Sequence, residues 1–260
     1  MAEPRRARRR RGGFSLIEIM VVIAMLSLLA GALAPAAIQQ LEQQRRAKTR
    51  ATLEQLATAL VGRPGSDDFG YLGDMGGLPP TLEDLNSAAG KPAYAFGAPG
   101  IGYGYAGPYA PTLRPGTANV FVDAWDLPFQ FAGAAQVRSA GPDRTFGNAD
   151  DLVEPAAAPP TTAALVVRVL GLPSGGGPVE TLAAPDANVF VSRSNAGSYQ
   201  EVAMVEPAGG PGPWTSTGLH LGHHGLRVVG TGSWASAGTL RDVATLHRGT
   251  TVLSVTLVQP

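Results

Sequence analysis

An apolar run near the amino terminus constrains this chain of 260 residues more than any other feature. The run begins at Phe14 and continues to about Leu33, and Glu18 is its single charged residue. At about 1.5 Å of rise per residue, a helix of this length crosses the roughly 30 Å hydrocarbon core of a bilayer. A carboxylate inside a bilayer costs at least about 2 kcal/mol unless it has a partner, so Glu18 is predicted to serve a function.

The residues before this run suggest what that partner is. Residues 1–13 form a basic leader. If this leader is cut between Gly13 and Phe14, a new α-amino group lies four residues from Glu18, at the membrane surface. No Lys or Arg follows Glu18 within one helical turn. The new amine, in the same or a neighbouring copy, is therefore the cation that could neutralise this carboxylate.

These residues resemble the processing signal and first helix of type IV pilins and type II secretion pseudopilins. Gly13, Phe14, Leu16, Ile17 and Glu18 together carry the resemblance. It implies that a prepilin peptidase cleaves after Gly13 and that Phe14 becomes N-methylated. It also implies that Glu18 and the Phe14 amine guide the docking of each subunit into a helical filament.

The distribution of charge supports export of the chain beyond the leader. Six of the 20 basic residues and one of the 20 acidic residues lie in residues 1–13, which leaves 14 basic and 19 acidic residues. A basic leader fits the positive-inside rule, so we expect the leader to be cytoplasmic and the remainder translocated. The resemblance to pilins then implies a single-pass protein of the bacterial inner membrane with a periplasmic globular part. Nucleic-acid binding is a poor interpretation of this cluster. The chain has no cysteine, so no disulfide can stabilise it.

Two other targeting signals are weaker interpretations. Ala32-Leu33-Ala34 is followed by Pro35, which would block cleavage by an ordinary signal peptidase. Arg10-Arg11 are wrongly spaced from Phe14 for a twin-arginine signal.

One long helix is predicted over residues 14–62, with its membrane segment at 14–35. Apolar residues recur at helical spacing beyond that segment, namely at Ile38, Leu41, Leu53, Leu56 and Leu60. Pro35 removes an intrahelical hydrogen bond, so we expect a kink or local melting there, or a simple break between anchor and soluble domain.

Residues 63–154 are predicted to form a globular domain that contains a short hairpin. Residues 120–122 and 129–131 alternate as strands do, and residues 123–126 make the turn. The pattern D-x-W-x-x-P-F-x-F resembles the signature of the major type II pseudopilin, in which Gly usually stands at the position of Asp126. Thr81 is predicted to cap a short helical turn, with Asp84 reaching back to it.

The segment Gly102-x-Gly104-x-x-Gly107 formally matches a dinucleotide-binding fingerprint. No apolar strand leads into it, and Pro108 follows where a phosphate-binding helix would have to begin. We therefore interpret the segment as an aromatic-rich loop packed on the sheet, similar to a loop of the secretion pilins.

Three carboxylates, those of Asp143, Asp150 and Asp151, fall within nine residues on a loop that also holds Gly141 and Gly147. Calcium takes six to eight oxygen ligands at about 2.3–2.6 Å, several of them backbone carbonyls, and short turning loops supply such ligands. The spacing is not that of an EF-hand. A solvated acidic turn without an ion is the alternative.

This loop resembles the calcium loop of the major pseudopilins, which directly follows the same hairpin. The resemblance implies calcium as a cofactor, with Asp143 and Asp151 as the best side-chain ligands and Asp150 as a third candidate. Carbonyls of residues 137–140 and of Arg144 or Phe146 would complete the shell. Arg144 stands where the family usually has Gly.

Residues 155–162 are predicted to be a linker, and residues 163–260 an independent β-sandwich domain. Six runs predict its strands, at residues 163–170, 187–193, 200–205, 220–230, 239–246 and 251–258. The pattern is similar to transthyretin-like or carboxypeptidase-regulatory-like sandwiches. His220, His223 and His224 suggest zinc, but a fourth ligand is missing nearby, so ordinary turn histidines are the better interpretation.

The predicted fold class is α+β, with a long amino-terminal helix packed on a small antiparallel sheet and a β-sandwich after it. We find no nucleophile elbow, Walker loop, H-E-x-x-H motif or cysteine nucleophile, so no enzyme is predicted. The predicted function is a structural subunit of a type II secretion pseudopilus or a related type IV filament. Its partners would be other pilin subunits, a prepilin peptidase and the inner membrane.

A membrane-tethered extracytoplasmic binding protein is the alternative function. In that case the carboxy-terminal domain would recognise carbohydrate or another ligand, and the helix would be only an anchor. The sequence leaves open whether a filament subunit of this kind is major or minor, although the bulk of the added domain favours a minor or tip position.

Overall fold

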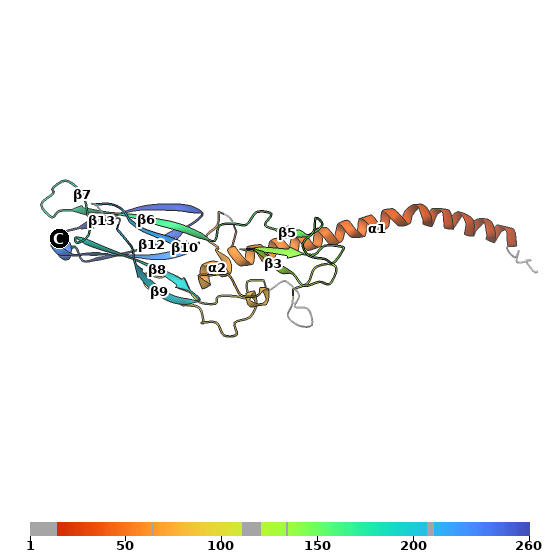
Figure 1. The fold of residues 1–260 in the computed structure, drawn as a ribbon, viewed down its shortest axis with the longest axis horizontal. Coiled ribbons are helices and arrows are strands. Elements are labelled where there is room, and N and C mark those ends of the chain that lie inside the picture. Colours follow the sequence, from red (N-terminus) through yellow and green to blue (C-terminus); the bar gives the residue numbers. More distant parts are fainter. Residues whose placement is uncertain (1–14, 64, 111–120, 134, 207–210) are drawn as a thin grey trace, which may run out of the picture. The chain divides into compact units, whose positions relative to one another are not determined.

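The computed structural model describes residues 15–63, 65–110, 121–133, 135–206 and 211–260. The chain divides into two compact units, residues 1–47 and residues 48–260. The class is α+β, as predicted: one long helix, small antiparallel sheets and a β-rich carboxy-terminal region (Figure 1). Gly13 and Phe14 lie outside the described residues.

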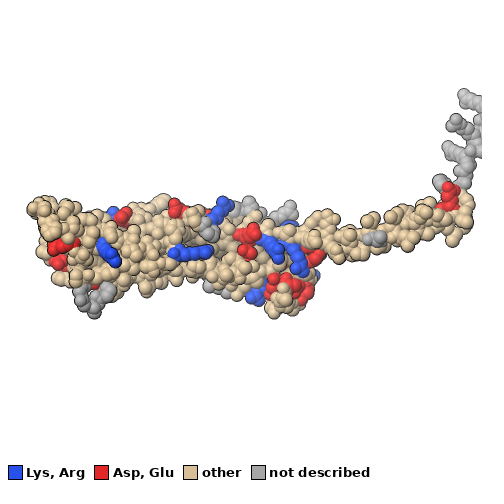
Figure 2. All heavy atoms as spheres, turned by 90° about the horizontal axis from the view of Figure 1, so that it is seen from above, with Lys and Arg blue, Asp and Glu red and all other residues tan. Residues whose placement is uncertain are grey.

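The long helix α1 runs from Leu16 to Val61. It continues through Pro35 without interruption, so neither local melting nor a break between anchor and soluble domain occurs there. Among the described residues, α1 is the one helix long and apolar enough to cross a membrane, and none of its most apolar stretch is buried. Figure 2 shows that the visible face of this stretch carries almost no charged side chains.

The carboxy-terminal turns of α1 belong to the second unit and contribute to its core. Leu53, Leu56 and Leu60 are fully buried, which confirms the predicted apolar face. They share a core with residues of a three-stranded sheet in the order β3-β4-β5. These strands are Gln130–Gly133, Gln136–Ser139 and Leu152–Glu154. Ile38 and Leu41, in the first unit, are 66% and 58% exposed.

The predicted hairpin before this sheet is present in a reduced form. Val122 pairs with Pro128 in an isolated antiparallel bridge, and the amide of Phe129 donates to the carbonyl of Phe121 over 3.0 Å. The first predicted strand is therefore only a bridge, and Val120 lies outside the described residues. Asp126 has φ +62°, so it adopts the left-handed conformation that Gly would adopt more easily.

Short elements connect α1 to this sheet. They are α2 (Gly70–Met75), a 3-10 turn (Leu82–Leu85) and the paired strands β1 (Ala95–Phe96) and β2 (Gly102–Tyr103). At the 3-10 turn, Oδ2 of Asp84 accepts hydrogen bonds from the amide of Thr81 at 3.0 Å and from its hydroxyl at 2.8 Å. Asp84 thus reaches back as predicted.

The carboxy-terminal strands form two sheets around one apolar core. One sheet has the order β10-β6-β13, with β7 beside β6, and the other has the order β12-β11-β8-β9. The strands are β6 (Thr162–Leu172), β7 (Glu180–Thr181), β8 (Ala187–Asn195), β9 (Ser198–Ala203), β10 (Trp214–His220), β11 (Gly222–Gly230), β12 (Thr239–Leu246) and β13 (Gly249–Val258). A 3-10 turn (Gly232–Ala237) lies between β11 and β12. All six predicted runs contain strands, while β7 and β10 were not predicted.

The α2 segment joins these two sheets to the remainder of the second unit. Phe69 and Leu72 lie in the core of the two sheets, whereas Met75 lies in the core that α1 lines. The hydroxyl of Ser194 donates to the carbonyl of Asp74 over 2.6 Å, and the amide of Gly197 donates to the carbonyl of Met75 over 2.8 Å. The domain boundaries inferred from the sequence stay a prediction, but residues 48–260 form one compact unit.

Candidate functional site

The first candidate site is the start of α1. Glu18 lies in the first helical turn and is exposed, and its amide donates to the carbonyl of Ser15 over 3.0 Å. A carboxylate in this position interacts favourably with the helix dipole, but only by about 0.3–1 kcal/mol when exposed. This is less than the cost of a carboxylate in a bilayer. A specific partner for Glu18 is therefore still required once the helix is in a membrane.

The second candidate site is the acidic loop between β4 and β5. Oδ1 of Asp143 accepts from the amide of Thr145 at 2.8 Å, and its Oδ2 accepts from Nδ2 of Asn148 at 2.5 Å. Oδ2 of Asp150 accepts a long hydrogen bond from the amide of Asp143, at 3.4 Å. Both carboxylates are thus held by donors of the loop itself.

Asp151 differs from the other two carboxylates because its side chain is only 6% exposed. Its Oδ2 accepts from the amide of Gly147 at 2.8 Å and lies 3.6 Å from Nε of Arg138, an ion pair too long for a hydrogen bond. Its Oδ1 is buried with no hydrogen-bond partner among the described residues. A buried, unpartnered carboxylate oxygen is costly, and a cation would satisfy it.

The described residues contain no group of three or more His, Cys, Asp or Glu side chains arranged to hold a metal. The three carboxylates of the loop are therefore not gathered into a side-chain cage. The loop still fits a hard cation, because its candidate ligand atoms are all oxygens and Oδ1 of Asp151 has no hydrogen-bond partner among the described residues. Arg144 has φ +62°, so the turn keeps the left-handed geometry although Gly is absent.

A buried network, which the sequence analysis did not identify, positions this loop. Oδ1 of Asp123 accepts from the amides of Trp125 at 2.9 Å and Leu127 at 3.0 Å, and its Oδ2 accepts from the hydroxyl of Ser139 at 2.6 Å. The amide of Ala124 donates to the hydroxyl of Thr49, on α1, over 3.2 Å. Ser139, the last residue of β4 before the loop, is thus bonded to the hairpin turn, and the turn is bonded to the helix.

The segment from Gly102 to Gly107 is not a phosphate-binding turn. Its first residue lies in the two-residue strand β2, and no helix follows among the described residues up to Ala110. The hydroxyl of Tyr105 donates to the carbonyl of Leu85 over 2.9 Å. The hydroxyl of Tyr109 donates to Oδ2 of Asp74 over 2.8 Å, and burial raises the pKa of both tyrosines. The segment is an aromatic loop packed on the core, as predicted.

The three histidines do not form a metal site among the described residues. His220 ends β10, whereas His223 and His224 lie within β11, so the prediction that they form a turn was wrong for these two. Nε2 of His224 lies 2.7 Å from the carbonyl oxygen of His220, and Nδ1 of His223 lies 3.1 Å from the hydroxyl of Thr245. Burial lowers the pKa of both His220 and His224.

Comparison with known proteins identifies the amino-terminal segment. Residues 8–34 match the family model described as the prokaryotic N-terminal methylation motif. This match covers the predicted cleavage position, Glu18 and most of the membrane segment, and it supports a type IV pilin-like protein that a prepilin peptidase processes. Together with the apolar helix it indicates membrane anchoring. No curated protein and no solved structure matches the chain.

Proposed function

We propose that this chain is a structural subunit of a type II secretion pseudopilus or a related type IV filament. The observation that carries the proposal is the exposed apolar stretch of α1, which contains one carboxylate and lies within the methylation motif. Before assembly, the subunit is anchored in the inner membrane with its globular part in the periplasm. Cleavage after Gly13 creates the Phe14 amine, which pairs with Glu18 of a neighbouring copy as subunits leave the bilayer.

Calcium binding at the acidic loop is part of this proposal. The buried, unpartnered Oδ1 of Asp151 supports it, as does the left-handed turn at Arg144. Asp143 and Asp151 would hold the ion together with backbone carbonyls, and Asp150 would serve as a third ligand. The ion would stiffen the loop between β4 and β5, which is already tied to α1 through the buried network.

The carboxy-terminal sheets would face outward from the filament or contact cargo. Their bulk favours a minor or tip subunit over a major one. The alternative function, a tethered binding protein, would keep these sheets as a ligand-binding module and would give Glu18 no role in assembly.

Replacing Glu18 by Ala tests the function directly. Cleavage after Gly13 should proceed, because the change leaves the leader and the cleavage position intact, whereas incorporation into filaments should fall to background. Glu54→Ala is the matched control, since Glu54 is an exposed carboxylate of the same helix beyond the apolar stretch. Normal incorporation of Glu18→Ala would refute the docking role of Glu18, whereas absence of the unaltered chain from filaments would support the tethered binding protein instead.

A further inference from the structure

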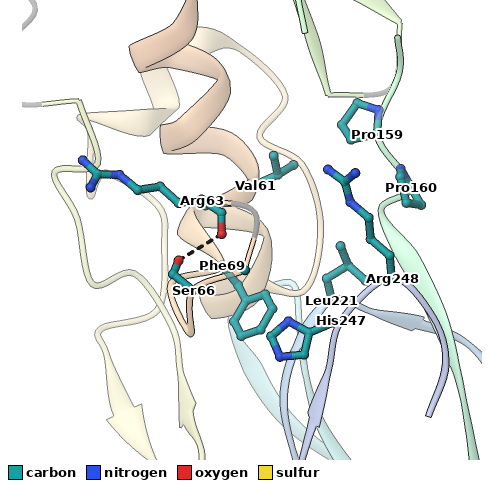
Figure 3. A pocket seen from close by; sticks show the side chains of 11 residues that line it. Val61, Arg63, Ser66, Phe69, Pro159, Pro160, Leu221, His247 and Arg248 are labelled. Carbon is teal, nitrogen blue, oxygen red and sulfur yellow. Dashed lines mark hydrogen bonds between the residues drawn. The ribbon is translucent and has the colours of Figure 1, made fainter.

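A hollow of about 340 Å³ lies in the second unit where several segments of the chain meet. Val61 at the end of α1, Phe69 before α2 and Leu221 between β10 and β11 give it an apolar lining. Pro159 and Pro160, which lead into β6, form another wall (Figure 3). A concave, mostly apolar site with few polar groups is typical of small-ligand binding.

The polar groups at this hollow are cationic or neutral. His247 and Arg248, in the turn between β12 and β13, line it together with Arg63. In Figure 3 the guanidinium of Arg248 lies between Val61 and the two prolines, whereas that of Arg63 points away. Among the described residues, no Asp or Glu lines the hollow and Arg248 has no ion pair. The hollow therefore combines apolar walls with an unpaired positive charge.

We propose that this hollow binds an apolar group that ends in a carboxylate. The apolar part would cover Phe69, Val61 and Leu221, and the carboxylate would accept two hydrogen bonds from the guanidinium of Arg248. A water molecule occupies about 30 Å³ of liquid, so the hollow of about 340 Å³ has room for a ligand of about ten non-hydrogen atoms. Both a small carboxylic acid and the free carboxy terminus of a peptide with an apolar last residue have this chemistry.

Calorimetric titration of the full chain in lipid nanodiscs tests the proposal. The probes are 3-phenylpropionate and its neutral isostere 3-phenylpropionamide. The acid should bind at least tenfold more tightly than the amide, and Arg248→Gln should remove at least tenfold of the acid's affinity. Arg241→Gln, which removes an exposed arginine of β12 outside the hollow, should leave the affinity unchanged. Equal binding of acid and amide, no binding of the acid, or an unaffected Arg248→Gln protein would overturn the proposal.

A second pair of probes distinguishes the two sources of the carboxylate. Acetyl-Gly-Gly-Phe with a free carboxy terminus binds more tightly than 3-phenylpropionate if the natural ligand is a chain terminus, and more weakly if it is a small acid. Both results support the site, provided that the peptide amide binds at least tenfold more weakly than the free peptide. The proposal is independent of filament assembly, so Glu18→Ala should bind the acid as the unaltered chain does.

Discussion

The hydroxyl of Ser139 donates a hydrogen bond to Oδ2 of Asp123 over 2.6 Å, and both residues are buried. This contact connects the start of the acidic loop to the hairpin turn, and the turn in turn contacts Thr49 of α1 through the amide of Ala124. The geometry of the proposed calcium loop thus depends on a polar network inside the core rather than on the loop alone.

Ser139→Ala should destabilise the protein by about 1–3 kcal/mol, because it leaves the buried carboxylate of Asp123 without its hydroxyl donor. The thermal midpoint of the second unit's unfolding measures this. Ser87→Ala removes a hydroxyl that accepts only an exposed local hydrogen bond and should change stability by less than about 0.5 kcal/mol. If the two substitutions lowered stability equally, the Ser139–Asp123 hydrogen bond would contribute no more to stability than an exposed local one.

Arg144→Gly should raise stability by about 0.5–1 kcal/mol. A non-Gly residue in the left-handed region costs about 1–2 kcal/mol, and the greater freedom of Gly in the unfolded chain offsets part of the gain. Thr145→Gly is the control, since Thr145 has no positive φ, and it should lower stability. The thermal midpoints of the two variants should move in opposite directions, and a lower midpoint for Arg144→Gly would contradict the assigned backbone geometry.

Chelation of calcium should lower the thermal midpoint, and added calcium should restore it. A ligand at 100 times its dissociation constant stabilises the folded state by about 2.7 kcal/mol. Asp151→Asn should abolish the response, because it neutralises the carboxylate whose Oδ1 is buried without a partner. Asp186→Asn is the control, because Asp186 directly precedes β8 and is not part of the loop, and this variant should keep the response. An unchanged melt of the unaltered protein with and without chelator would refute calcium binding.

Stability should decrease as the solution becomes acidic. Burial lowers the pKa of His220 and His224, so the unfolded chain binds protons more readily than the folded one. Their contribution to stability is fully present above the unfolded pKa of about 6.5 and is lost as the pH falls from there through the lower folded values. Denaturation curves at several pH values measure this, and His224→Gln should flatten the profile in that window. If the unaltered and His224→Gln proteins had the same dependence of stability on pH, the acid sensitivity would come from other residues than His224.

Local patterns in the sequence were sufficient to predict the helix and most of the strands. Leu53, Leu56 and Leu60 are spaced so that one helix face must be buried, and alternation marked the long strands. Strand β10 was missed because its register shifts between Ser216 and Leu219, which breaks the alternation of a regular strand. The bridge Val122–Pro128 is shorter than predicted because Pro128 has no amide hydrogen to continue a ladder.

The sequence could not predict contacts between distant segments. Ser194 donates to the carbonyl of Asp74, 120 residues away, and nothing local to either residue indicates that pairing. The same holds for Asp123 and Ser139, which are 16 residues apart. The three acids of the candidate calcium loop form a cluster in the sequence. Whether the folded loop brings them together depends on which hydrogen-bond donors reach each carboxylate. Those donors are set by the folded conformation of the loop, which the sequence pattern does not give.

The amino terminus of the mature protein tests the central proposal most directly. Mass spectrometry of the chain purified from membranes of a strain with a prepilin peptidase should find a first residue of N-methylated Phe14. The same chain from a strain without the peptidase should retain residues 1–13. A mature chain that begins after Ala34 or Ala37, or one that keeps its leader in the presence of the peptidase, would contradict assembly as a pilin-like subunit.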